Sequence, residues 1–207
     1  MRLPSFPVLT CSLFATAAAL STASADFQLG LGAGGFMGTE YDENAAFGLE
    51  AEMGYLSQDQ PINLFVGLRA GYIDGLESKY DNAFYRDHSD MDLFEGAFVT
   101  RLLFPLGFDK LKIYGEGSLG SANVSVSGNA KARARVGGRE FSVRSHFDES
   151  DWVLAWGLGA GLQFDFTRNF GVRVGYNFHG FGDIQVSDAD RDPGSVNGLT
   201  SSLIFKF

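Results

Sequence analysis

The segment from residue 152 to 166 alternates almost without interruption between large apolar and small residues, and it limits the possible folds more than any other feature. Its even positions carry two tryptophans, three leucines, two phenylalanines and one alanine, whereas its odd positions include three glycines. A period of two is that of a β-strand, whose successive side chains point to opposite faces. This strand exceeds the roughly 5–6 residues that are common in soluble proteins. It therefore predicts a narrow closed barrel with an apolar exterior.

Seven other segments repeat this alternation of apolar residues with glycine or polar residues. Strands are expected over residues 26–37, 46–56, 62–73, 91–104, 111–122, 170–181 and 197–207, in addition to 152–166. The connections 57–61, 105–110 and 167–169 are short, whereas 38–45, 74–90, 127–151 and 182–196 are mostly longer and polar. This pattern predicts an all-β, eight-stranded, antiparallel up-and-down transmembrane β-barrel. Its short turns and both termini are expected on the periplasmic side.

The first 25 residues have the composition of a cleavable export signal. Arg2 supplies a positive charge, residues 8–20 are apolar, and Ala23-Ser24-Ala25 fits a small-x-small cleavage site. The mature barrel domain is then expected to span residues 26–207. The single cysteine, Cys11, lies within the signal, so the mature chain has no thiol. A formal charge of −9 for the full chain argues against general nucleic-acid binding.

A soluble barrel with an internal ligand cavity is the alternative architecture. Such a barrel places apolar residues inside and covers its exterior with charged residues. Here the apolar faces carry almost no Lys, Glu or Asp, and the opposite faces are too rich in glycine for a solvated exterior. These features favour the membrane barrel.

The eight alternating segments and the final strand Leu-Thr-Ser-Ser-Leu-Ile-Phe-Lys-Phe resemble the small eight-stranded outer-membrane barrels of the OmpA/OmpX type. The resemblance covers residues 26–207. It implies a bacterial outer-membrane location, surrounding lipid and lipopolysaccharide, and recognition of Phe205 and the terminal Phe207 by the barrel-assembly machinery. Ser201 departs from the pattern, because an apolar residue is usual there.

Charged residues on the inward parity are candidate residues of a lumen network. They are Glu50, Glu52, Arg69, Glu95, Arg101, Lys112, Glu116, Asp165, Arg173 and Lys206. In a narrow barrel such charges must be paired or hydrated. The expected registers place Arg69 diagonal to Glu50, Arg101 diagonal to Glu116, and Arg173 diagonal to Asp165. A side-chain-filled lumen is the prediction, with a gated ion path as the alternative.

Other candidate sites are weaker. A lipid A deacylase would need a serine beside a histidine and a carboxylate, but His179 is expected inside the barrel near its rim and no His-x-Ser motif occurs. His88 and His146 are expected in loops. Residues 188–194 resemble the start of a calcium loop, yet Leu199 replaces the glutamate expected at position twelve and Pro193 replaces the turn glycine. No catalytic residue, metal site or cofactor is therefore predicted.

The connection 127–151 contains its own alternating hairpin around Gly137-Gly138. Pairing Val136 with Arg139 places Arg135 opposite Glu140, Arg133 opposite Ser142, and Lys131 opposite Arg144. The basic residues of this hairpin are Lys131, Arg133, Arg135, Arg139 and Arg144, and all but Arg139 lie on one face, opposite an apolar one. Either it merely extends the neighbouring strands, or it binds a polyanion such as lipopolysaccharide.

Together these patterns predict an integral outer-membrane barrel with a filled lumen and an envelope or adhesin-like surface role. A small low-conductance channel is the second interpretation, and a lipid A-modifying enzyme is the third.

Overall fold

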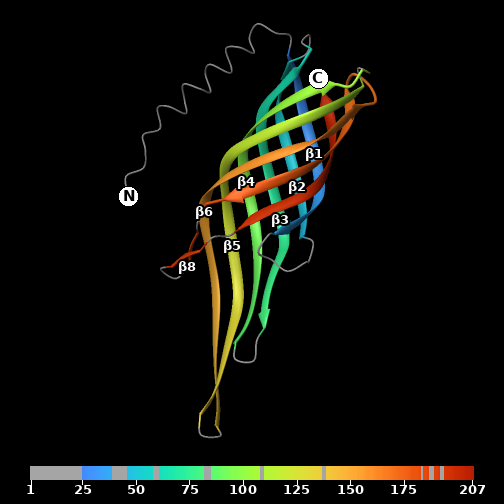
Figure 1. The fold of residues 1–207 in the computed structure, drawn as a ribbon. Helices are drawn as coiled ribbons and strands as arrows, with labels where there is room; N and C mark the ends of the chain where they lie inside the picture. Colours follow the sequence, from blue (N-terminus) through green and yellow to red (C-terminus); the bar gives the residue numbers. More distant parts are fainter. Residues whose placement is uncertain are drawn as a thin grey trace, which may run out of the picture.

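The computed structural model describes residues 25–38, 46–57, 61–81, 85–107, 110–136, 139–182, 184–186, 189–191 and 194–207. Within these residues, eight strands form a closed antiparallel barrel in the order β1-β10-β7-β6-β5-β4-β3-β2 (Figure 1). The barrel strands are β1 (Ala25–Gly38), β2 (Ala46–Ser57), β3 (Asn63–Asp81), β4 (Tyr85–Pro105), β5 (Leu111–Val136), β6 (Arg139–Asp165), β7 (Phe170–Phe181) and β10 (Ser195–Lys206). β8 (Ile184–Val186) and β9 (Ala189–Arg191) form a separate small hairpin between β7 and β10. The expected up-and-down barrel is confirmed.

Both ends of the barrel sequence lie on one rim. The register pairs Ala25 with Ser57, at the end of β2, and Gln28 with Lys206, near the end of β10. The Phe207 amide donates to the Phe27 carbonyl oxygen at 2.9 Å. The short connections are on this same rim, which we call the short rim. The expected signal lies outside the described residues apart from Ala25.

Four strands are much longer than the sequence pattern suggested. β3 and β4 have 19 and 21 residues, and β5 and β6 have 26 and 27, whereas β2, β7 and β10 have 12 each. The segments 74–90 and 127–151, expected as connections, are mostly paired strand that continues to Asp81↔Arg86 and Val136↔Arg139. Figure 1 shows these two hairpins projecting far beyond the other strands.

The reason for this difference is that the alternation continues with its sense reversed. Lower on β5, Ile113 and Leu119 face outward and are exposed, whereas further along, Val124 and Val126 face inward and are buried. The predicted strands end where apolar residues no longer fall on the outward positions. The period of two nevertheless continues beyond that point.

A β-bulge adjusts β3 where this reversal occurs. The register of β3 and β4 shifts between Ile73 and Leu76, and Gly75 has a positive φ of 87°. Such a φ is readily adopted only by glycine. The extra residue places both Ile73 and Leu76 inside, although their positions have opposite parity, and both are buried.

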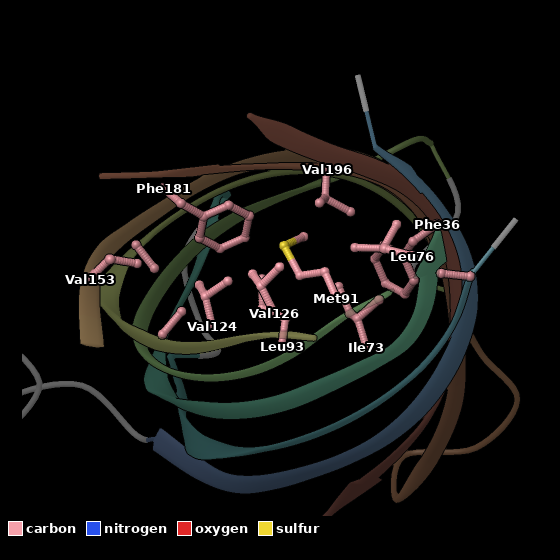
Figure 2. Packing of buried hydrophobic residues seen from close by; sticks show 13 residues of the cluster. Phe36, Ile73, Leu76, Met91, Leu93, Val124, Val126, Val153, Phe181 and Val196 are labelled. Carbon is pink, nitrogen blue, oxygen red and sulfur yellow. The ribbon is translucent and has the colours of Figure 1, made fainter. Parts of the chain in front are cut away.

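Apolar side chains fill the half of the lumen away from the short rim. We call this half the upper lumen and the half next to the short rim the lower lumen, although Figure 1 draws the short rim at the top. Figure 2 shows Met91 near the centre of this group, surrounded by residues from several strands. The group, called the apolar plug below, consists of Phe36, Ala46, Ile73, Leu76, Met91, Leu93, Ala122, Val124, Val126, Val153, Ala155, Phe181 and Val196. A smaller cluster near the short rim contains Leu56, Phe65, Val99, Leu103 and Tyr114. Among the described residues, no helix has the length and hydropathy needed to cross a membrane.

Candidate functional site

Glu52 is an acceptor at which several buried donors of the lumen meet. Arg101 donates to both carboxylate oxygens, from Nη1 to Oε1 at 3.0 Å and from Nη2 to Oε2 at 2.7 Å. Arg173 Nη1 donates to Oε1 at 2.6 Å, and Gln28 Nε2 donates to the same oxygen at 3.3 Å. A carboxylate removed from water needs such donors, because an unpaired buried charge is costly. Glu52 therefore ties β1, β4 and β7 to β2.

Arg101 connects Glu52 to a second buried carboxylate, that of Glu116. Arg101 Nε donates to Glu116 Oε2 at 2.8 Å, and Arg69 Nη1 donates to Glu116 Oε1 at 2.7 Å. The Arg101 guanidinium carbon also lies 4.9 Å from the centroid of the Phe65 ring. Arg101 is completely buried, so carboxylates and an aromatic face take the place of water around its charge.

A separate ionic group lies closer to the short rim, around Asp165. Lys206 Nζ is 2.7 Å and Lys112 Nζ is 3.1 Å from Asp165 Oδ2. Gln163 Nε2 donates to the other carboxylate oxygen at 3.0 Å. All four residues are buried. Two lysines thus share one carboxylate at the entrance to the lumen.

His179 and Glu95 lie at the upper limit of the charged region. His179 Nδ1 is 2.8 Å from Glu95 Oε2, and Glu95 Oε1 is 3.7 Å from Arg69 Nη2. The His179 ring also packs edge-on against Phe36 of the apolar plug, with 6.0 Å between ring centroids. The lumen therefore has two consecutive closures: a charged network below and the apolar plug above.

Every candidate lumen charge lies on the inward face, but only one predicted pair is confirmed. Arg101 does contact Glu116, although the register places the two directly opposite each other and not on a diagonal. The Arg69–Glu50 pair was wrong, because Arg69 contacts Glu116 and lies near Glu95.

The Arg173–Asp165 pair was also wrong. Arg173 contacts Glu52 and lies 3.5 Å from Glu50, whereas Asp165 contacts the two lysines. In a barrel this narrow, an arginine side chain reaches across the lumen, so neighbouring positions on adjacent strands do not determine its partner.

Sequence reasoning missed three parts of the site. Glu52 was among the candidate residues, but the sequence did not indicate that several donors share it as their acceptor. The Tyr114 ring lies near two guanidinium groups, with the Arg101 and Arg173 guanidinium carbons 5.3 and 5.7 Å from its centroid. The apolar plug was missed as a whole, although the reversed alternation at Val124 and Val126 would have revealed it.

The β5–β6 hairpin has the register expected from the sequence. Lys131 pairs with Arg144, Arg133 with Ser142, Arg135 with Glu140, and Val136 with Arg139. The hairpin is an uninterrupted extension of β5 and β6. Its basic positions therefore lie beyond the apolar plug, at the end of the molecule opposite the short rim (Figure 1).

The last residues of the chain lie on the short rim with their aromatic rings outward. The side chain of Phe207 is 70% exposed, and its ring centroid is 6.3 Å from that of Phe27. Phe205 packs against Phe170, with 5.5 Å between centroids. Recognition of these residues by an assembly machinery stays a prediction.

Two acidic regions lie outside the network. Asp92 lies on the exterior of β4 beyond Phe94, where partial burial raises the pKa of its carboxyl, and a hydrogen bond with Asp74 acts in the same direction. In the calcium-like segment 188–194, residues 188, 192 and 193 fall outside the described residues, and residues 189–191 form β9. Among the residues that are described, no group of three or more His, Cys, Asp or Glu side chains is arranged to hold a metal.

Comparison with known proteins agrees with this geometry. The family model of the outer membrane protein beta-barrel domain matches residues 7–207. The chain belongs to this outer-membrane β-barrel family. Its location in the bacterial outer membrane follows from that membership. The band of exposed apolar side chains around the barrel exterior, called the apolar band below, is therefore the lipid-facing surface. Among curated proteins, none matches the sequence.

Solved structures of small barrels resemble this outer-membrane barrel in fold. Neisserial surface protein A has 13% identity and a TM-score of 0.53, with 89% of this chain and 99% of that chain covered. Ail, the attachment invasion locus protein of Yersinia pestis, has 16% identity and a TM-score of 0.43, with 88% and 97% covered. The outer membrane enzyme PagL has 16% identity and a TM-score of 0.43, with 86% and 98% covered. The likeness to Neisserial surface protein A concerns the fold alone.

Proposed function

We propose that this outer-membrane barrel is a closed surface-display protein whose β5–β6 hairpin binds polyanions. The observation that carries the proposal is the length of β5 and β6, 26 and 27 residues, compared with 12 residues for β2, β7 and β10. Among the described strands, only β5 and β6, which form the hairpin, are about twice as long as these three. The short rim is taken as periplasmic, which places both termini inside the cell envelope and the hairpin at the surface.

Basic residues recur at alternate positions of this hairpin. Lys131, Arg133 and Arg135 share the parity of Leu119, which faces outward on the same strand, and Arg144 pairs with Lys131. Arginine favours phosphate and sulfate groups because its planar fork donates two parallel hydrogen bonds. The proposed ligand is the phosphorylated core of lipopolysaccharide, and contacts of this kind weaken as salt is raised.

The test replaces Lys131, Arg133, Arg135 and Arg144 together with Gln. Binding to immobilised lipopolysaccharide should fall roughly tenfold or more at low salt, equivalent to about 1.4 kcal/mol or more. A matched control replaces Lys110 and Arg168, two exposed basic residues of the short rim, and should bind as the parent does. Equal binding by the quadruple variant and the parent would reduce the hairpin to a structural extension.

A channel function is the second candidate, and the double closure of the lumen argues against it. Planar-bilayer recordings of the parent should show no steady conductance. Opening should require loss of the apolar plug, because water leaves a narrow apolar constriction readily. A reproducible conductance in the parent would replace the closed-barrel proposal with the channel.

A lipid A-modifying activity is the third candidate. The Glu95–His179 pair is the only histidine–carboxylate contact among the described residues, and it is buried inside the lumen and not directed toward lipid. The mass of lipid A should therefore be unchanged in cells that express the barrel. Loss of an acyl chain that depends on His179 would overturn this assignment.

A further inference from the structure

The lipid-facing wall of the barrel carries a groove that the proposed function does not use. The groove crosses β1 to β4 and has a cavity volume of about 810 Å³. Its exposed lining is almost entirely apolar, although Glu52 and Arg69, whose side chains face the lumen, also border it. The wall of a barrel is convex, so a groove at one place depends on the particular side chains that form it.

Small residues form the floor of the groove at consecutive register positions. Ala51 pairs with Ala70, and Ala70 pairs with Gly96, so the three lie in one row across β2, β3 and β4. The row that borders this floor toward the short rim consists of Leu29, Met53, Leu68 and Phe98. The row on the other side consists of Leu49, Tyr72 and Phe94. The groove is lined by this floor and by the large residues toward the short rim, together with Leu31 of β1 and Phe205 of β10, whereas Leu49, Tyr72 and Phe94 lie beyond it.

The glycine in this floor is not required by local packing. A Cβ atom built on Gly96 would meet no other heavy atom within 4 Å. At Gly67, by contrast, a Cβ would collide with the Met53 carbonyl oxygen and the Phe65 ring. A larger residue could therefore occupy position 96 without disturbing the sheet, and its absence leaves the groove open.

The groove rises across the wall as it passes from strand to strand. Ala51 is six residues from the short-rim end of β2, Ala70 is seven from that of β3, and Gly96 is nine from that of β4. The β4 end lies directly below Tyr72 and Phe94, the exposed aromatic residues at the upper edge of the apolar band. In the next strand the row continues with Ser121, which pairs with Gly96 and is exposed. A polar hydroxyl thus lies just beyond the Gly96 end of the groove, on the neighbouring strand.

We infer that the groove seats one acyl chain of lipopolysaccharide, with the polar end of that chain leaving the groove past Gly96 toward Ser121. The lipid-facing surface is the established interface of this region, and the groove is continuous with it. Its oblique rise toward the aromatic edge is the path of a chain that descends from the outer membrane surface. The choice of lipopolysaccharide over phospholipid rests on the proposed orientation, which puts the upper edge in the outer leaflet.

A second copy of the barrel fits this surface poorly. Barrel walls are convex, so two of them touch along the rims of the groove and leave its floor empty. A single methylene chain is narrow enough to contact the floor and the large residues that border it, and it gains dispersion contacts along its length. The groove therefore favours a lipid chain over a protein partner.

The experiment compares bound lipid in three proteins purified in mild detergent: the parent, the Ala70→Leu/Gly96→Leu variant, and the Gly115→Leu control. Gly115 also faces outward with no atom within 4 Å of a built Cβ, but it lies outside the groove. Native mass spectrometry with added rough lipopolysaccharide should show one retained molecule on the parent and the control. The filled-groove variant should retain it about tenfold less. A gel shift on heating shows that all three barrels are folded.

Several outcomes would overturn the inference. These are retention of lipopolysaccharide by the filled-groove variant, equal loss in the Gly115→Leu control, no retained lipid on the parent, or displacement of lipopolysaccharide by an equal amount of phosphatidylethanolamine. A dimer of the parent that the filled-groove variant abolishes would assign the groove to a second copy. Because the basic hairpin is proposed to bind the same lipopolysaccharide, all three proteins are compared with Lys131, Arg133, Arg135 and Arg144 replaced by Gln, so failure here leaves the hairpin proposal untouched.

Discussion

The lower and upper parts of the barrel use the same alternation with opposite sense. On β5, Lys112 and Glu116 face inward while Ile113 and Leu119 face lipid. Further up the same strand, Val124 and Val126 face inward, while the alternate residues Ser125 and Ser127 are on the outer face. The medium outside the wall explains the change: next to lipid the exterior must be apolar, whereas beyond the membrane the apolar residues turn inward.

Different interactions consequently close the lumen in the two parts of the barrel. The lower lumen is held by directional ion pairs around Glu52 and Glu116, and each charge depends on its partners. The apolar plug is held by close packing and burial, which are less directional. Loss of a single partner should therefore do most damage below, and loss of volume should do most damage above.

The largest expected effect is that of Arg101→Met. This change removes a fully buried cation and takes one arginine donor from each of two buried carboxylates, which should cost about 3–5 kcal/mol. Urea unfolding of the barrel in lipid vesicles measures it. The Glu52→Gln/Arg101→Met double variant should recover part of the loss, and additive effects of the two changes would contradict a coupled network.

Next in size is Met91→Ala in the apolar plug. Met91 is fully buried, so its truncation leaves a cavity and should cost about 2–5 kcal/mol in the same assay. Met53→Ala is the matched control, because Met53 is 53% exposed on the lipid-facing wall and lipid can fill the space. Equal effects at the two methionines would mean that the plug is not packed as a core.

The boundary between the two parts can be located with lysine substitutions on the outer face. Leu158→Lys puts a charge in the lipid-facing band, where Leu158 is 61% exposed, and should cost about 2–4 kcal/mol. Ser125→Lys lies above the reversal on β5 and should be nearly neutral. Similar folding yields for both variants in vesicles would place the boundary elsewhere.

The smallest effect concerns Asp92, just beyond the reversal on β4. Because its pKa is raised in the folded barrel, the ionised form is disfavoured, and the folded state loses stability as pH rises through that pKa. Asp92→Asn should therefore stabilise the barrel at neutral pH by less than about 1 kcal/mol, since the site is partly solvated. The gain should vanish below about pH 4, near the ordinary carboxyl value of 3.8. A gain that is independent of pH would refute this account.

The sequence by itself determined the eight strands, their inward and outward faces and the register of the β5–β6 hairpin. These features follow from local chemistry, because a period of two and a Gly-Gly turn act between residues that are close along the chain. The inward position of Arg101 and the outward position of Leu158 could therefore be read directly. The tertiary structure alone decided which charges meet: Arg69 reaches Glu116 and Arg173 reaches Glu52, because long side chains cross a narrow lumen. The apolar plug and the lipid-facing groove were likewise decided by closure, since each is built from residues of several strands that only the barrel brings together.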